Sequence, residues 1–181
     1  SVDRDDLPDG GAGHFRDVVK ACRSEMPQLK FELLVPDFRD CQDRALEVLA
    51  DALPFVFGHN IETVPSLYPK ARPGGEYRRS LDLLDKAKKA WPEIQTKSAL
   101  MLGLGETDDE VLSALKDLRS VGCDRAAIGQ YLQPDKNSLE VTEFVPPEKF
   151  EFWANMARSL GFEWIMSSPF TRSSYHAEQK G

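Results

Sequence analysis

Three polar segments have the residue types and positions of a ligand-binding site. Residues 59–63 (HNIET) and 101–106 (MLGLGE) follow stretches typical of buried strands, and residues 172–177 (RSSYHA) lie near the C-terminus. Amides, carboxylates and hydroxyls bind polar ligands, and ligands of parallel α/β sheets bind at the strand ends. We therefore expect these segments to form one active face.

Strand and helix signals alternate along the chain and predict the elements that position this face. Apolar and β-branched runs predict strands at 30–35, 55–64, 96–102, 125–132 and 162–166. Helical spacing of apolar residues predicts helices at 11–26, 40–53, 77–91, 107–121 and 147–160. A capping box at 107–110, with Gly122 and Gly161 at helix ends, supports these boundaries, and 65–75 is expected to be a loop.

Repeated strand–helix units with apolar strands predict an α/β fold with a parallel sheet, either a barrel or an open doubly wound sheet. Five strands are too few for the usual eight-stranded barrel. The polar segment 1–12 is typical of a loop that follows a strand, so we expect that an earlier strand is missing from this sequence.

Composition excludes several classes of function. The net charge of -7 and pI near 5.0 argue against nucleic-acid binding, which requires a basic surface. The sequence has no apolar run of the roughly 18 residues that cross a membrane, and its first residues do not resemble a signal peptide. We expect a protein without a membrane partner, located in the cytoplasm or, in a eukaryote, in the mitochondrial matrix.

The cysteines do not indicate a metal site. Cys22, Cys41 and Cys123 are widely and irregularly spaced, without a CxxC pair or a Cys/His cluster. We expect all three to be small buried apolar side chains.

Six motifs in unbroken order carry a family resemblance. They are SVDRDDLPDGGA at 1–12, HNIETV at 59–64, RRSL at 78–81, KSALMLGLGET at 97–107, GQYLQP at 129–134 and RSSYHA at 172–177. Together they resemble lipoyl synthases, which are radical S-adenosylmethionine (SAM) enzymes. Ala99, Ser168 and Glu140 depart from the Gly, Gly and Pro that we expect there.

The resemblance implies insertion of two sulfur atoms at C6 and C8 of an octanoyl chain on a carrier-protein lysine. It implies two 4Fe-4S clusters and SAM as cofactors, because side chains alone cannot make the radical that unactivated C–H bonds require. Implied partners are octanoylated E2 subunits of 2-oxoacid dehydrogenases, the glycine cleavage H protein, and an electron donor such as ferredoxin or flavodoxin.

Neither three-cysteine cluster motif of the family occurs in the sequence. We therefore expect residues 1–166 to form the later units of an incomplete (β/α)6 barrel, followed by a tail at 167–181. This fragment is expected to be inactive alone.

The resemblance also assigns cofactor-binding residues. Asn60 and Glu62 would hold the ribose hydroxyls, side by side on one strand face, although a turn with a surface carboxylate would explain them too. Met101, Gly103 and Glu106 would pack the adenine, while Glu106 also suits the start of the following helix. We expect His59 to be structural and assign no catalytic side chain.

Charged groups are assigned to the remaining parts of the site. Asp3, Arg4 and Asp5 would lie near the methionine end of SAM, with Arg79, or alternatively Arg78, pairing with its carboxylate. In the tail, Ser173 is expected to supply an oxygen ligand to the sulfur-donating cluster, with Ser174 as the alternative.

Lys70 and Arg72 could contact an acidic carrier domain. Two other classes of function remain open, a sulfur-inserting enzyme resembling biotin synthase and a degenerate fragment that acts as an interaction module. The RSSY tail favours lipoyl synthase over both.

Overall fold

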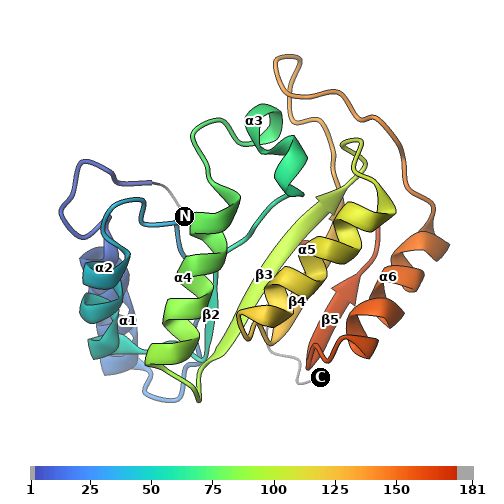
Figure 1. The fold of residues 1–181 in the computed structure, drawn as a ribbon. Coiled ribbons are helices and arrows are strands. Elements are labelled where there is room, and N and C mark those ends of the chain that lie inside the picture. Colours follow the sequence, from blue (N-terminus) through green and yellow to red (C-terminus); the bar gives the residue numbers. More distant parts are fainter. Residues whose placement is uncertain (1–2, 175–181) are drawn as a thin grey trace.

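A single parallel sheet with helices packed on its outer side makes up the computed structural model, which describes residues 3–174 (Figure 1). The strands are β1 (Glu32–Leu34), β2 (Val56–Gly58), β3 (Gln95–Leu102), β4 (Arg125–Gln130) and β5 (Trp164–Ser167). The longer helices are α1 (Ala12–Glu25), α2 (Gln42–Leu49), α4 (Tyr77–Ala90), α5 (Asp108–Ser120) and α6 (Pro147–Ser159). Short helical turns are η1 (Ala50–Ala52), η2 (Pro65–Leu67) and α3 (Tyr68–Ala71).

The strand order decides between the two architectures that the sequence left open. All neighbours pair in parallel and in sequence, β1-β2-β3-β4-β5. A doubly wound sheet reverses its order at a switch point, whereas a barrel wall does not. The sheet is therefore a partial barrel wall, as predicted, and β1 and β5 are its edges.

Side chains alternate between the two faces of β3 and β4. Leu100, Leu102, Ala126 and Ile128 pack against the helices in the main core. Ala99 and Ala127 lie on the opposite, inward face, where they form a small cluster with Trp164 and Met166. The inward face therefore carries small residues beside the carboxyl ends of the strands.

The helix boundaries follow the local signals. Thr107 accepts a hydrogen bond from the Glu110 amide while the Glu110 carboxylate binds the Thr107 amide, which confirms the predicted capping box. Gly122 and Gly161 follow α5 and α6 with φ values of 75° and 91°, the left-handed conformation that glycine adopts most readily. These ends fix where β4 and β5 begin.

Two predictions about the segment after β2 are wrong. The strand ends at Gly58 instead of continuing to Val64, and only an isolated bridge joins Glu62 to Leu100. Residues 65–75 are not an open loop, because η2 and α3 fold over the carboxyl end of β3 (Figure 1). The polar residues after β2 are thus covered by a second layer of chain.

Candidate functional site

A cavity of about 180 Å³ opens on the inward face at the carboxyl ends of β3 and β4. Its lining combines polar residues after β2, small and apolar residues of the strands, and the tail: Asn60, Glu62, Ala99, Leu100, Met101, Ala127, Gly129, Gln130, Leu132, Thr171, Arg172 and Ser173. Four predicted site residues, Asn60, Glu62, Met101 and Ser173, are brought together here. Gly103, Glu106, Asp3, Arg4 and Arg79 do not line it.

Asn60 and Glu62 meet, but not by strand alternation. The Asn60 Nδ2 donates to Glu62 Oε1 at 3.1 Å. Glu62 has a φ of 64°, a left-handed conformation that is uncommon for residues other than glycine, so the predicted strand geometry is wrong. Its backbone is held by β3, because the Glu62 amide donates to the Ala99 carbonyl and the Met101 amide donates to the Glu62 carbonyl.

Burial changes the acid–base character of Glu62. Removal of the carboxyl from water raises its pKa above the ordinary value, more than the Asn60 hydrogen bond lowers it. Within residues 3–174, the second carboxylate oxygen accepts no hydrogen bond from the protein and is available to a ligand hydroxyl.

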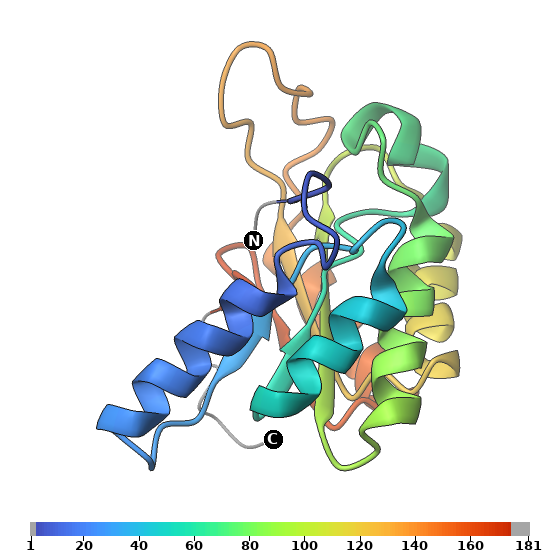
Figure 2. The ribbon, with the colours of Figure 1, turned by 90° about the vertical axis from the view of Figure 1, so that its left-hand side faces the viewer.

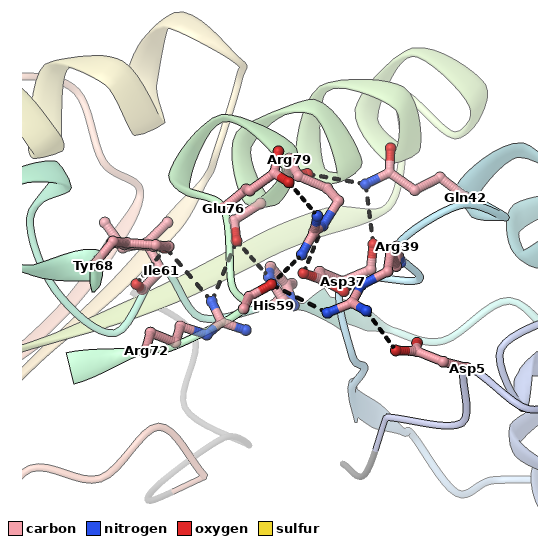
Figure 3. Close-up of polar contacts among 12 residues, drawn as sticks. Asp5, Asp37, Arg39, Gln42, His59, Ile61, Tyr68, Arg72, Glu76 and Arg79 are labelled. Atoms are coloured by element: carbon pink, nitrogen blue, oxygen red, sulfur yellow. Dashed lines mark hydrogen bonds and ion pairs between the residues drawn. The ribbon is translucent and has the colours of Figure 1, made fainter. Parts of the chain in front are cut away.

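Tyr68 of α3 and Arg72, which follows this helix, hold the Asn60–Glu62 turn, and Figure 3 shows both beside Ile61. The Tyr68 hydroxyl donates to the Ile61 carbonyl at 2.7 Å, and Arg72 donates to the Asn60 carbonyl at 3.1 Å. The Arg72 guanidinium also reaches Ser80 Oγ at 3.3 Å. Arg72, which we proposed as a carrier contact, is thus engaged with the site turn, whereas Lys70 is exposed.

His59 has a structural environment. It is 2% exposed, with Nδ1 2.9 Å from the Val35 carbonyl and Nε2 3.0 Å from Ser80 Oγ. A carbonyl can only accept, so Nδ1 carries the proton and Nε2 accepts from the serine hydroxyl. Burial lowers the pKa of His59 to about 4, so the ring is neutral at physiological pH.

The predicted adenine-packing turn is held by its own glutamate. Glu106 accepts hydrogen bonds from the amides of Gly103, at 2.6 Å, and Leu104, at 3.0 Å. Gly103 has a φ of 98°, and a Cβ there would overlap Gln130 Nε2 and the Glu143 carbonyl. Both residues therefore shape the backbone beside the cavity, and Met101 lines it.

Arg79 of α4 belongs to a separate polar group with Asp37 and Glu76. Arg79 Nε donates to Asp37 at 2.8 Å and Nη1 donates to Glu76 at 2.8 Å. Burial alone would raise the pKa of Asp37, but hydrogen bonds from Arg79 and from the Arg39 amide hold it below its ordinary value. The guanidinium of Arg79 is thus already paired within the chain.

The other charged candidates are exposed. Arg78 pairs with Asp82 at 3.3 Å on the outside of α4, and Arg4 pairs with Asp6 at 2.7 Å in the N-terminal loop, where Asp3 is exposed as well. Asp5 pairs with Arg39 at 3.3 Å (Figure 3). A role for any of them in holding the methionine end of SAM stays a prediction.

Gln130 is a site residue to which sequence reasoning gave no role. Its Nε2 donates to the carbonyls of Tyr131 and Glu143, and its Oε1 accepts from the Val145 amide. It thereby closes the base of the long loop 131–146, which extends away from the sheet beyond the end of β4 (Figure 2). A glutamine at the end of a fully buried strand was the available signal.

The beginning of the tail lies on the inward face. The amides of Ser168 and Gln130 donate to the Ile128 and Pro169 carbonyls at 3.2 and 3.3 Å. Ser173 lines the cavity, whereas the alternative ligand Ser174 is exposed and does not. Tyr175 and His176 lie outside the described residues.

The described residues do not provide a ligand set for an iron–sulfur cluster. Within residues 3–174, no three His, Cys, Asp or Glu side chains converge in a way that could hold a metal ion. Cys123 is fully buried, which raises its pKa to about 12, while Cys22 and Cys41 are partly exposed, contrary to our expectation that all three are buried.

Comparison with known families places the fold. The sequence profile of the radical SAM superfamily matches residues 1–118. The chain belongs to the radical SAM superfamily. Members of this superfamily use S-adenosylmethionine and an iron–sulfur cluster. A solved structure of methylornithine synthase (PylB) aligns with a TM-score of 0.55 at 14% identity, covering 93% of this chain and 58% of that chain, which supports the barrel fold.

Individual relatives confirm the motif resemblance. The chain is 54% identical to a lipoyl synthase of Methylococcus capsulatus, over 99% of this chain and 56% of that protein. It is 51% identical to a lipoyl synthase of Alcanivorax borkumensis and 52% identical to one of Pseudoalteromonas translucida, over 98% and 99% of this chain and 55% and 56% of those proteins. The chain thus spans about half the length of these relatives.

In the part of the chain that the structure describes, no helix is both long and apolar enough to cross a bilayer.

Proposed function

We propose that this chain forms the later part of the barrel of a lipoyl synthase and supplies its nucleoside site and tail ligand. One observation carries the proposal: a single cavity brings together the Asn60–Glu62 pair, the small strand residues and Ser173. Identity of 54% to a lipoyl synthase along nearly the whole chain supports the same assignment.

The cavity residues fit an adenosyl group. Ala99 and Ala127 leave space next to the sheet, while Met101 and Leu132 offer apolar surface for a flat ring. The Glu62 oxygen not bound by Asn60 can accept from a ribose hydroxyl, and Asn60 retains an amide oxygen for a donor. When bound and reductively cleaved, SAM supplies the radical for chemistry at an unactivated C–H bond.

The proposal includes two 4Fe-4S clusters, with cysteines supplied by the part of such enzymes that this sequence does not cover. Ser173 would give one oxygen ligand to the sulfur-donating cluster. An oxygen among thiolates is a mismatched ligand for iron in a cluster and should be the first to be displaced.

The substrates proposed are octanoylated carrier domains, namely E2 subunits and the glycine cleavage H protein, with ferredoxin or flavodoxin as electron donor. We propose a cytoplasmic location, or the mitochondrial matrix in a eukaryote. The exposed Lys70 beside the site layer remains the candidate for carrier contact.

A chimaera tests this function. The part of the Methylococcus capsulatus protein that precedes the matched segment is joined to this chain, the clusters are reconstituted without oxygen, and lipoyl formation on an octanoylated H protein is measured by mass spectrometry. We expect conversion by the chimaera and a loss of roughly 100-fold in Ser173→Ala. Ser174→Ala and the exposed control Lys136→Ala should retain activity; a chimaera that binds both clusters and SAM but forms no lipoyl group would refute the proposal.

A further inference from the structure

A buried lysine lies on the inward face of the sheet, below the cavity. Lys97 is on β3, two and four residues before the cavity residues Ala99 and Met101, and is 1% exposed. Its Nζ is 2.8 and 3.0 Å from the two carboxylate oxygens of Glu32 on β1. The ring centroid of Trp164, from β5, is 4.8 Å away.

The same ammonium also reaches the tail. Lys97 Nζ donates to the main-chain carbonyl of Ser173, 76 residues later in the sequence. An ammonium has three donors, and the Glu32 carboxylate takes two of them, so the third is directed to the tail carbonyl without loss of the ion pair. The carbonyl that it binds belongs to Ser173, a residue that lines the cavity.

The neighbouring strand provides a second contact for the tail. Gly129 on β4 has no side chain, and the Thr171 carbonyl occupies the place where a Cβ would lie. Two residues on, the Ser173 carbonyl binds Lys97, so alternate carbonyls of the tail meet β4 and then β3. In an extended segment every second residue faces the same side, so the carbonyls of Thr171 and Ser173 can reach Gly129 and Lys97 together.

We propose that Lys97 is a positioning residue that holds the tail against the sheet and thereby directs the Ser173 side chain into the cavity. The proposed consequence for metal ligation by Ser173 rests on the proposed function, but the docking of the tail does not. Burial of a charge requires paired partners, and Glu32 with the Ser173 carbonyl supplies them. Lys97 therefore has a role beyond packing within the strand, which is to bind the tail.

Tryptic cleavage of the Arg172–Ser173 bond tests the proposal on this chain without clusters or SAM. Mass spectrometry follows the rate of this cut under conditions that leave the folded barrel intact. Lys97→Met removes the ammonium, and Lys97→Met with Glu32→Gln removes both charges and leaves no unpaired carboxylate. We expect trypsin to cleave this bond at least about tenfold faster in both variants than in the unsubstituted chain, because local opening of the tail exposes the bond.

Two further variants separate positioning from general stability. Lys88→Met is the matched control, because Lys88 Nζ also binds a carboxylate, Asp124 at 2.9 Å, and a carbonyl, Ile94 at 3.2 Å, but makes no hydrogen bond to residues 167–174 of the tail. Trypsin should cleave Lys88→Met at the same rate as the unsubstituted chain. Lys97→Arg keeps a cation and should restore most of the protection of the Arg172–Ser173 bond. Unchanged cutting in the double variant, or equal acceleration in Lys88→Met, would overturn the proposal.

A measurement on unsubstituted side chains covers the case in which neither Lys97→Met variant folds. Competitive acetylation of Lys97 is compared between the full chain and a chain shortened after Thr171. We expect acetylation at least about tenfold faster in the shortened chain, since the tail no longer covers the ammonium. Equal rates in the two chains would overturn the assignment.

Discussion

Acidification should weaken the fold through His59. The ring is neutral in the folded protein, where burial lowers its pKa from 6.5 to about 4. Between these two pKa values His59 binds a proton in the unfolded chain but not in the folded chain. The contribution of His59 to stability is therefore fully present above the pKa of the unfolded state and is lost as the pH falls toward the pKa of the folded state. Protonation would also place a new donor against Ser80, which already receives Arg72.

The size of the effect follows from the two pKa values. With 6.5 for the unfolded and about 4 for the folded state, linkage gives a loss of about 2 kcal/mol between about pH 7.5 and about pH 5. Asp37 and other carboxylates with lowered pKa add to the same trend, so the total slope alone does not isolate His59.

A variant without a titrating side chain at position 59 isolates the contribution of His59 to the pH dependence of stability. Urea unfolding followed by tryptophan fluorescence gives the free energy of unfolding of the original chain and of His59→Gln at both pH values. His59→Gln should be less stable at the higher pH because two buried hydrogen bonds change, and the gap should narrow by about 2 kcal/mol at the lower pH. A gap that stays constant would refute the neutral, structural assignment of His59.

Three other substitutions test how the site is built. Gly103→Ala should lose about 2–3 kcal/mol in urea unfolding, because a Cβ would overlap Gln130 and the Glu143 carbonyl; a loss under about 0.5 kcal/mol would contradict the close approach. Gln130→Leu should speed amide exchange of residues 142–145 by about tenfold while α5 is unaffected, since one side chain closes that loop; unchanged exchange would mean that the loop holds itself. Thr107→Ala should cost about 1 kcal/mol by loss of the capping box, measured by thermal unfolding, whereas Thr142→Ala on the exposed loop should be neutral; equal effects would argue against the cap.

Local signals predicted most of the elements because each had its own physical cause. The Thr107 box and the glycines after α5 and α6 marked helix ends that the structure places within one or two residues. The order of the sheet could not come from such signals, since a barrel wall and a doubly wound sheet use the same strand–helix units. It depends on which strands pair, and pairing is a tertiary property.

The Asn60–Glu62 pair shows where sequence patterning fails. Alternating polar and apolar residues favoured a strand, but Arg72 and Tyr68 hold the carbonyls of Asn60 and Ile61 and bend the chain into a turn. The motif identified the right residues with the wrong geometry. Lys97 was missed for a related reason: a lysine in an apolar strand is a signal of a buried partner, but Glu32 lies 65 residues away in the sequence.

The most direct test of the central claim is SAM binding by the reconstituted chimaera, with and without the Asn60 side chain. Equilibrium dialysis should give a dissociation constant about tenfold higher or more for Asn60→Ala, since a lost hydrogen bond to the ligand weakens binding by roughly that factor. Lys136→Ala, an exposed control, should bind like the original chimaera. Equal affinity in all three proteins would contradict the assignment of the cavity as the nucleoside site of a lipoyl synthase.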